Sequence, residues 1–340
     1  MLGMSSEEKG KLGLLGAAFV LAVNTILIAV VHWDLWALSG VRALFALPVL
    51  LVTLLLSEGE KKKIKIDDLL QWQAAIAYVI HSVSFVGGVL LGSPVSVAIA
   101  VFAFPIWTDL LSAREFRCVW EMLTGRTRTT RGRPWDRWHT LLLVGVVCGE
   151  VLLFISDGWN KVPGNVLGLI SGFVFGVFIC YLKMMENRDT GGLQSVIKGN
   201  MIVTGIGFFV IFFYLFTGRS DLLSYNQGIS GAGGMSIVIL VGLLSGLAFA
   251  AIPHFVKSVP AVPAQWHLAM ELVFTGALYY LWTGVRPSWK TCVAGAIVFA
   301  FVVKSTRWKE KGKGRSRTVV SRKDATNPRS VVGGNGRNGK

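Results

Sequence analysis

Ten apolar stretches follow one another along the chain, each close to the length that a helix needs to cross a membrane. A transmembrane α-helix takes about 20 predominantly apolar residues. A soluble domain of this size has no need of so many long runs with so few charges inside them. We therefore expect an all-α polytopic membrane protein with ten transmembrane helices. The ten predicted spans are residues 11–31, 35–56, 72–92, 94–112, 139–156, 163–183, 199–217, 236–256, 264–283 and 290–306.

Positive charge gathers on alternate sides of these spans. The net charge is +15, which in a soluble chain would suggest nucleic acid as a partner. The loops on one side hold 15 Lys and Arg, whereas those on the other side hold four: Lys161, Arg219, Arg286 and Lys290. Lys and Arg accumulate in cytoplasmic loops. We therefore expect both termini in the cytoplasm and the plasma membrane as the location, with membrane lipids as partners and no nucleic acid.

Two sequence correspondences indicate an internal repeat. Leu12-Gly13-Leu14 and Leu167-Gly168-Leu169 lie early in the first and sixth spans, 155 residues apart, and Pro94 and Pro260 lie 166 residues apart. Five spans are followed by five, and an odd number per repeat inserts the second repeat upside down. Inverted repeats with a binding site at their interface are typical of secondary transporters. The fold that we expect is therefore two inverted five-helix repeats.

The chain divides accordingly into repeats, a loop and tails. The segments are a cytoplasmic N-terminal tail at 1–10, a first repeat at 11–156 with a basic cytoplasmic loop at 113–138, a second repeat at 163–306, and a basic disordered cytoplasmic tail at 307–340. The loop contains seven Arg, which suits contact with anionic headgroups. The C-terminal tail has few large apolar residues, so it is predicted to be disordered.

Glycines recur every four residues in the sixth span. They are Gly164, Gly168, Gly172 and Gly176. This spacing puts them on one face of a helix, where glycine lowers stability unless it allows close approach of another helix. We interpret the stripe as a helix-packing surface, and a surface on which helices slide is a further hypothesis.

Ionisable residues inside the spans are candidates for a functional site. A charge at the bilayer centre costs about 2.5–3.5 kcal/mol, so it is expected only beside a cavity or a partner. Arg42 lies in the second span, Glu271 in the ninth, His81 in the third, and Asn24 in the first at a depth similar to that of Arg42. We interpret them as substrate-binding or coupling residues, with Arg42 and Glu271 lining one cavity between the repeats. A structural ion pair is the alternative for these two.

Three other ionisable residues have less clear roles. Asp109 and His267 lie closer to the cytoplasmic ends of their spans and can reach the interface. Glu150, in the fifth span, fits a helix contact as well as a site.

No pattern typical of an enzyme stands out. There is no Walker A sequence, and the four cysteines form no C-x-x-C pair. We therefore expect no ATPase, no catalytic residues, no metal, no disulfide framework and no cofactor. The segment Gly242–Gly246, followed by His254 and His267, matches an intramembrane serine protease only faintly, because its spacing is not G-x-S-x-G.

Motifs in the second, fourth and ninth spans have counterparts in a known family. Ser39-Gly40-Val41-Arg42 carries a basic residue in the second helix, and the run Ala98–Phe104 of small and apolar residues precedes Pro105 in the fourth. In these features the chain resembles the drug/metabolite transporter superfamily and, within it, the EamA-like transporters. Glu115 resembles the acidic residue often found at the end of the fourth helix. Glu271-Leu272 stands where the second repeat often has Glu-Pro, and the acid at the end of helix nine is missing.

The resemblance implies a central cavity lined by helices one to four and six to nine, with helices five and ten at the periphery. It favours Arg42, His81, Trp107, Glu271 and Thr275 as residues at the cavity, and it counts against Glu150. It also implies a small-molecule substrate and leaves a homodimer open.

We therefore expect a secondary transporter that moves a small polar or amphipathic metabolite, amino-acid-like or carboxylate-bearing, by alternating access. Arg42 would attract the carboxylate, Glu271 or His81 would couple movement to protons, and Trp107 would supply an apolar wall. Two other classes stay open, namely a non-transporting membrane receptor or scaffold and an intramembrane enzyme. Uptake by reconstituted liposomes would distinguish the first class from the others.

Overall fold

The computed structural model describes residues 5–31, 33–57, 68–111, 137–186, 191–218, 232–256, 258–259 and 261–302. Over these residues the chain is built of helices, and seven of them are long and apolar enough to cross a membrane. These are the helices of a multi-pass membrane protein. Most of the basic loop, including Glu115, and the whole C-terminal tail lie outside the described residues.

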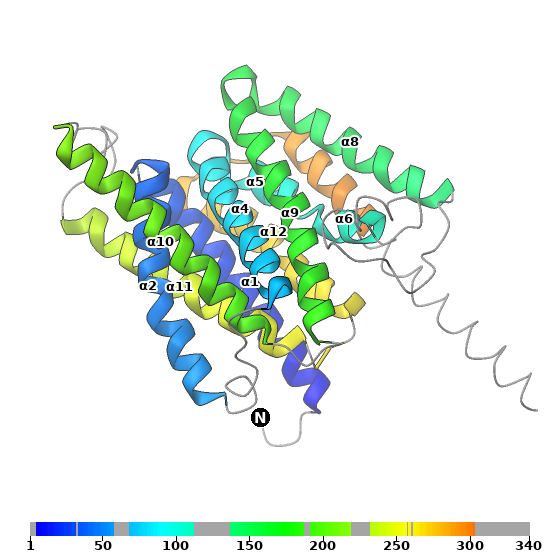
Figure 1. Ribbon diagram of the computed structural model, residues 1–340. Coiled ribbons are helices and arrows are strands. Elements are labelled where there is room, and N and C mark those ends of the chain that lie inside the picture. Colours follow the sequence, from blue (N-terminus) through cyan, green and yellow to red (C-terminus); the bar gives the residue numbers. More distant parts are fainter. Residues whose placement is uncertain are drawn as a thin grey trace, which may run out of the picture.

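The helices appear in the following order (Figure 1). They are α1 (Ser6–Val30), α2 (Leu35–Leu56), α4 (Leu69–Leu91), α5 (Pro94–Val101), α6 (Phe104–Leu111), α8 (Arg137–Asp157), α9 (Val162–Glu186), α10 (Gly192–Phe216), α11 (Ala232–Val256) and α12 (Ala261–Thr283). A short 3-10 turn, η2 (Trp159–Lys161), joins α8 to α9. A shorter apolar helix at Trp289–Val302, called the 289–302 helix below, follows α12.

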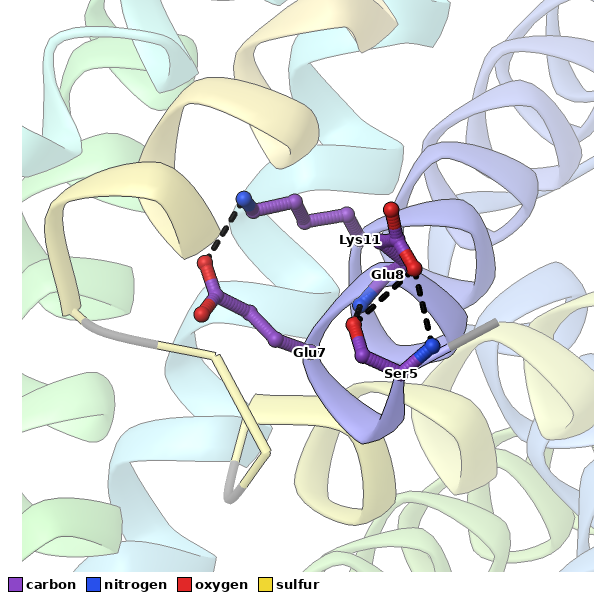
Figure 2. A network of polar contacts seen from close by, with 4 residues as sticks. All are labelled: Ser5, Glu7, Glu8 and Lys11. Carbon is purple, nitrogen blue, oxygen red and sulfur yellow. Dashed lines mark hydrogen bonds and ion pairs between the residues drawn. The ribbon is translucent and has the colours of Figure 1, made fainter. Parts of the chain in front are cut away.

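Helix α1 starts five residues earlier than the sequence pattern predicts, because its first turn is capped. The hydroxyl of Ser5 accepts a hydrogen bond from the Glu8 N–H (3.3 Å), and the Glu8 carboxylate accepts one from the Ser5 N–H (2.8 Å), as Figure 2 shows. This reciprocal capping box satisfies two backbone donors that a helix start leaves unpaired. Glu7 and Lys11 add an ion pair of 2.6 Å one turn apart. Residues 6–10 of the predicted tail are therefore helical.

The fourth predicted span is not one helix. Instead α5 ends at Val101 and α6 begins at Phe104, with a turn at Phe102–Ala103 between them. Pro105 explains the interruption, because it has no N–H to donate to the Val101 carbonyl and its ring clashes with the carbonyl four residues back. Hydrogen bonds between residues three apart stabilise the turn, such as the one that the Ala103 N–H donates to the Ala100 carbonyl (3.2 Å).

Helix α10 begins at Gly192, seven residues before the predicted start. The added turns are polar, and their side chains find partners on α4. Lys198 Nζ donates to Gln71 Oε1 (2.8 Å), and the side-chain nitrogen of Gln71 donates to Gln194 Oε1 (3.1 Å). Hydropathy alone missed this extension because buried hydrogen-bond partners on another helix make polar residues acceptable there.

The glycine stripe of α9 lies against the end of α4, against α5 and against α6. A Cβ atom added at Gly172 would lie 2.5 Å from the carbonyl oxygen of Ala100, and one added at Gly164 would lie 2.3 Å from the backbone nitrogen of Gly92. These contacts involve backbone atoms, which cannot rotate away as a side chain can. The stripe therefore forms a close backbone-to-backbone contact of the kind that small residues permit in membranes.

Helix α8 and the 289–302 helix lie together at one edge of the bundle, where Figure 1 shows them in green and orange. Gly145 and Gly149 of α8 face Phe301 and Val298 of the other helix. The remaining long helices form the body of the bundle, and the cavity described next lies among them.

Candidate functional site

A small cavity in the body of the bundle is lined by side chains from α1, α2, α4, α5, α9, α11 and α12. Its polar lining residues are Asn24, Arg42, His81, Ser82 and Glu271. Its apolar lining residues are Leu21, Phe85, Val101, Phe175 and Phe249. The free volume is about 20 Å³, which is room for about one water molecule. Four side chains singled out in the sequence, from four different helices, thus meet at one place.

Arg42 is the centre of the polar contacts. Its side chain is only 2% exposed, its Nη1 donates to the hydroxyl of Ser245 (2.9 Å), and its Nη2 donates to the hydroxyl of Ser82. Its Nε–H is buried and has no hydrogen-bond partner. Over the described residues, no carboxylate oxygen lies within 4.0 Å of the guanidinium. A buried cation with an unused donor and no counter-charge is a site that favours an anion.

The serine contacts join several helices. Ser245 on α11 accepts from Arg42 and lies 3.4 Å from the side-chain oxygen of Asn24 on α1, a long contact. Ser82 on α4 accepts from the other end of the guanidinium. Arg42 is therefore oriented by hydroxyl groups, which fix its direction without neutralising its charge.

Glu271 supplies a carboxylate to the same cavity from α12. Its side chain is 8% exposed, and it does not form an ion pair with Arg42. The alternative that the two residues form a structural ion pair is thus wrong for this conformation. The cavity has a basic group from the first half of the chain and an acidic group from the second half, held apart.

His81 forms one wall of the cavity and connects α4 to α9. Its Nδ1 lies 2.9 Å from the Ser171 hydroxyl, and its ring stacks on Phe175 with centroids 4.5 Å apart. These contacts fix the ring on both its edge and its face. The imidazole is therefore a rigid part of the wall.

Trp107 and Thr275 are not among the residues that line the cavity. Trp107, on α6, packs against Phe173 (ring centroids 5.6 Å apart) and beside Gly176. Trp107 is therefore part of the α6–α9 contact. Thr275 is fully buried on α12, about one turn beyond Glu271, and its hydroxyl has no hydrogen-bond partner.

The other ionisable candidates also lie apart from the cavity lining. Glu150 on α8 is 4% exposed, and neither carboxylate oxygen has a hydrogen-bond partner. His267 lies on α12, about one turn before Glu271, and it does not line the cavity. The side chain of Asp109 falls outside the described residues.

Ser82 and Ser245 are site residues that the sequence analysis missed. A single serine in a transmembrane helix is common and gives no signal of its own. Ser245 was noticed only within the Gly242–Gly246 segment, and its spacing there points to packing. A search for small hydroxyl residues on helices predicted to lie beside Arg42 would have found both.

Comparisons with known proteins support the fold without naming a function. No family model and no curated protein matches the sequence. A solved structure described as "Crystal structure of protein" superposes with a TM-score of 0.59 over 89% of this chain and 98% of that chain, at 13% sequence identity. At this identity the likeness concerns the fold alone.

Proposed function

We propose that this protein is a secondary transporter of the drug/metabolite type, which moves a small carboxylate-bearing metabolite across the membrane by alternating access. The observation that carries the proposal is the buried cavity that Arg42 and Glu271 both line without forming an ion pair with each other. Burying a charge without a counter-ion is costly, so such groups inside membranes mark pathways for substrates or ions. A substrate carboxylate would use the free Nε–H of Arg42, and an amino group or a proton would neutralise Glu271.

The helix contacts support a ten-helix fold made of two inverted repeats. In this arrangement α1, α2, α4, α5–α6 and α8 correspond to α9, α10, α11, α12 and the 289–302 helix. The α4–α9 contact then has its counterpart in α11–α1, the α2–α11 contact in α10–α4, and the α1–α12 contact in α9 with α5 and α6. Such matched pairs are what a two-fold axis in the membrane plane produces.

The crossing of α2 and α10 supports the same symmetry. Gly40 and Gly207 face each other, and a Cβ added at Gly207 would lie 2.4 Å from the Gly40 Cα. The two glycines are 167 residues apart, close to the 166 that separate Pro94 from Pro260. Equivalent residues of two repeats meet in this way at a two-fold axis. Arg42 lies two residues further along α2, about 3 Å along the helix axis, so the cavity is at nearly the same depth as this crossing.

The size of the cavity fits an occluded state of the transport cycle. About 20 Å³ admits no metabolite, so helices around the cavity must move apart before a substrate binds. The polar lining is drawn from both proposed repeats, and rocking of one repeat against the other would open it to each side in turn.

Uptake by liposomes that contain the purified protein tests the proposal. The panel should contain radiolabelled amino acids, monocarboxylates and amines, each assayed with and without a pH gradient. We expect saturable uptake of at least one carboxylate-bearing compound, and at least a tenfold loss with Arg42→Ala. Lys161→Ala, which removes a cation from η2 outside the cavity, should leave uptake unchanged. Absence of uptake across the panel, from protein that is folded in the liposomes, would favour a receptor or scaffold instead.

A further inference from the structure

We propose that a groove on the outer face of α12 is a binding site for one anionic phospholipid. One acyl chain would lie between α5, α12 and the 289–302 helix, and the headgroup would lie at residues 286–290. This inference does not depend on the proposed transport function, because the groove and the central cavity are on different sides of α12.

The body of the groove is apolar and has a volume of about 310 Å³. Val95 and Ile99 line it from α5, Leu272 and Gly276 from α12, and Ala296 and Phe299 from the 289–302 helix. A volume of this size is within the range of small-molecule pockets. Val273, which also lines the groove, is 47% exposed, so the groove is open on its outer side. In a transmembrane segment this outer side faces hydrocarbon, which an acyl chain can fill.

A polar cluster borders one end of the groove. Thr291 lines the groove there, and its hydroxyl forms a cluster with those of Ser156 (2.8 Å) and Ser288 (2.9 Å). This cluster joins the end of α8 to the start of the 289–302 helix. The three hydroxyls bond one another, and the exposed Ser288 places a polar group at the rim of the groove.

Cationic and aromatic side chains surround the polar end. Arg286 and Lys290 lie directly beside the lining residues Pro287 and Thr291, and the sequence from 284 to 302 contains no acidic residue. The guanidinium of Arg286 lies 6.0 Å from the Tyr280 ring centroid, and Trp289 is 71% exposed. Exposed Trp and Tyr are typical of the membrane–water interface. Asp157, which accepts a hydrogen bond from Asn165 (3.1 Å), is one acidic residue against the two cations Arg286 and Lys290, so the charge at this end is net positive.

An apolar groove that ends in cations and hydroxyls at headgroup depth has the polarity profile of an anionic phospholipid. The exposed face of α8 is apolar and leads to Asp157, so a second copy of the chain is the alternative occupant that the experiment distinguishes from a lipid. Leu272 faces the groove whereas its neighbour Glu271 faces the central cavity. Thus α12 separates the lipid site from the cavity.

Native mass spectrometry of the detergent-purified protein tests the proposal, with phosphatidylglycerol and phosphatidylcholine titrated separately. A Cβ added at Gly276 meets no heavy atom within 4 Å, so Gly276→Leu fills part of the groove without displacing a helix. Gly205→Leu on α10 is the matched control, because a Cβ there is equally unhindered and lies away from the groove. Arg286→Gln combined with Lys290→Gln tests the headgroup contact.

We expect one phosphatidylglycerol per protein at low lipid concentration, at least tenfold weaker binding in Gly276→Leu, and unchanged binding in Gly205→Leu. Arg286 and Lys290 lie on the side that the charge distribution predicts to be non-cytoplasmic, so the proposed lipid would belong to that leaflet. The double Gln variant should lose the preference for phosphatidylglycerol over phosphatidylcholine by about fivefold per cation, the effect expected of a basic side chain beside an anionic headgroup. Equal binding of the two lipids to the unmodified protein, or equal binding by the two glycine variants, overturns the proposal. A dimer that Gly276→Leu dissociates also overturns it, because a second copy would then be the occupant.

Discussion

At the scale of single residues, Arg42 is the least expected feature of the bundle. A guanidinium that is 2% exposed normally has a carboxylate beside it, yet here two serine hydroxyls take that place. Hydroxyl oxygens offset only part of the cost of removing the charge from water. We therefore expect Arg42 to lower the stability of the resting protein, a cost that the proposed binding of an anionic substrate would explain.

Replacing Arg42 with Met should raise stability and abolish transport together. A charge at the membrane centre costs about 2.5–3.5 kcal/mol, of which the two serine hydrogen bonds offset part, so we expect a gain on the order of 1–2 kcal/mol. Ser82 and Ser245 can turn to backbone carbonyls of their own helices when the partner is lost. Thermal unfolding in detergent and liposome uptake measure the two effects.

Arg42→Lys is the control for that experiment. It keeps the charge but loses the planar fork that binds a carboxylate through two hydrogen bonds. It should therefore reduce transport without raising the melting temperature. A lower melting temperature for Arg42→Met than for the unmodified protein would show that the cation is a structural element.

Glu271 should carry the proton dependence of uptake. A pH gradient with the acidic side outside the liposomes should drive accumulation of substrate inside liposomes that contain the unmodified protein. Glu271→Gln, whose side chain cannot ionise, should bind substrate but lose the response to the gradient. Glu150→Gln is the matched control, because Glu150 is also a buried and unpaired carboxylate but does not line the cavity. A gradient response that survives in Glu271→Gln, or disappears in Glu150→Gln, contradicts this assignment.

At the scale of helices, the stripe on α9 sets how closely α5 can approach. Gly172→Leu should lower stability by about 1–3 kcal/mol or more, because the carbonyl of Ala100 cannot move aside as a side chain would. Gly16→Leu on α1 is the control, since a Cβ there meets nothing within 4 Å. Melting temperatures of the two variants in the same detergent provide the comparison, and similar values for both would refute the packing interpretation.

Hydropathy predicted most helices well and failed where tertiary contacts decide the boundary. The bounds of α2 agree with the prediction to the residue, because Asp34 caps its start and the apolar run stops at Leu56. The extension of α10 to Gly192 was missed, since its polar residues are stabilised by α4, which no local pattern reveals. The break before α6 was missed although Pro105 was noted, because the resemblance suggested a proline within a single helix.

The charged residues of the candidate site could be predicted from the sequence, but the residues that contact them could not. The cost of Arg42 and Glu271 in a membrane identifies them from the sequence, and both line the cavity. Trp107 and Thr275 were inferred from resemblance, and neither lines the cavity. The serines that hold Arg42 could not be predicted, because their role depends on which helices lie side by side.

At the scale of the whole molecule, the charge distribution predicts the orientation in the membrane. In a variant whose four native cysteines are replaced by Ala, a cysteine at Ser224 should react with a membrane-impermeant maleimide applied to intact cells, and one at Thr127 should react only after the cells are opened. Both positions lie in predicted loops outside the described residues. Labelling of Thr127→Cys in intact cells would reverse the predicted topology.

The interruption between α5 and α6 creates a point beside the cavity wall at which the chain can bend. A straight helix must break a main-chain hydrogen bond to bend, whereas here Pro105 lacks the N–H that would have closed this bond to Val101, which itself lines the cavity. Helix α5 is held by α9 and α12, while α6 is held by α9 and α8. Bending at Phe102–Ala103 therefore needs less energy than bending elsewhere in these helices, and such bending would move α6 relative to α5, which packs against α12.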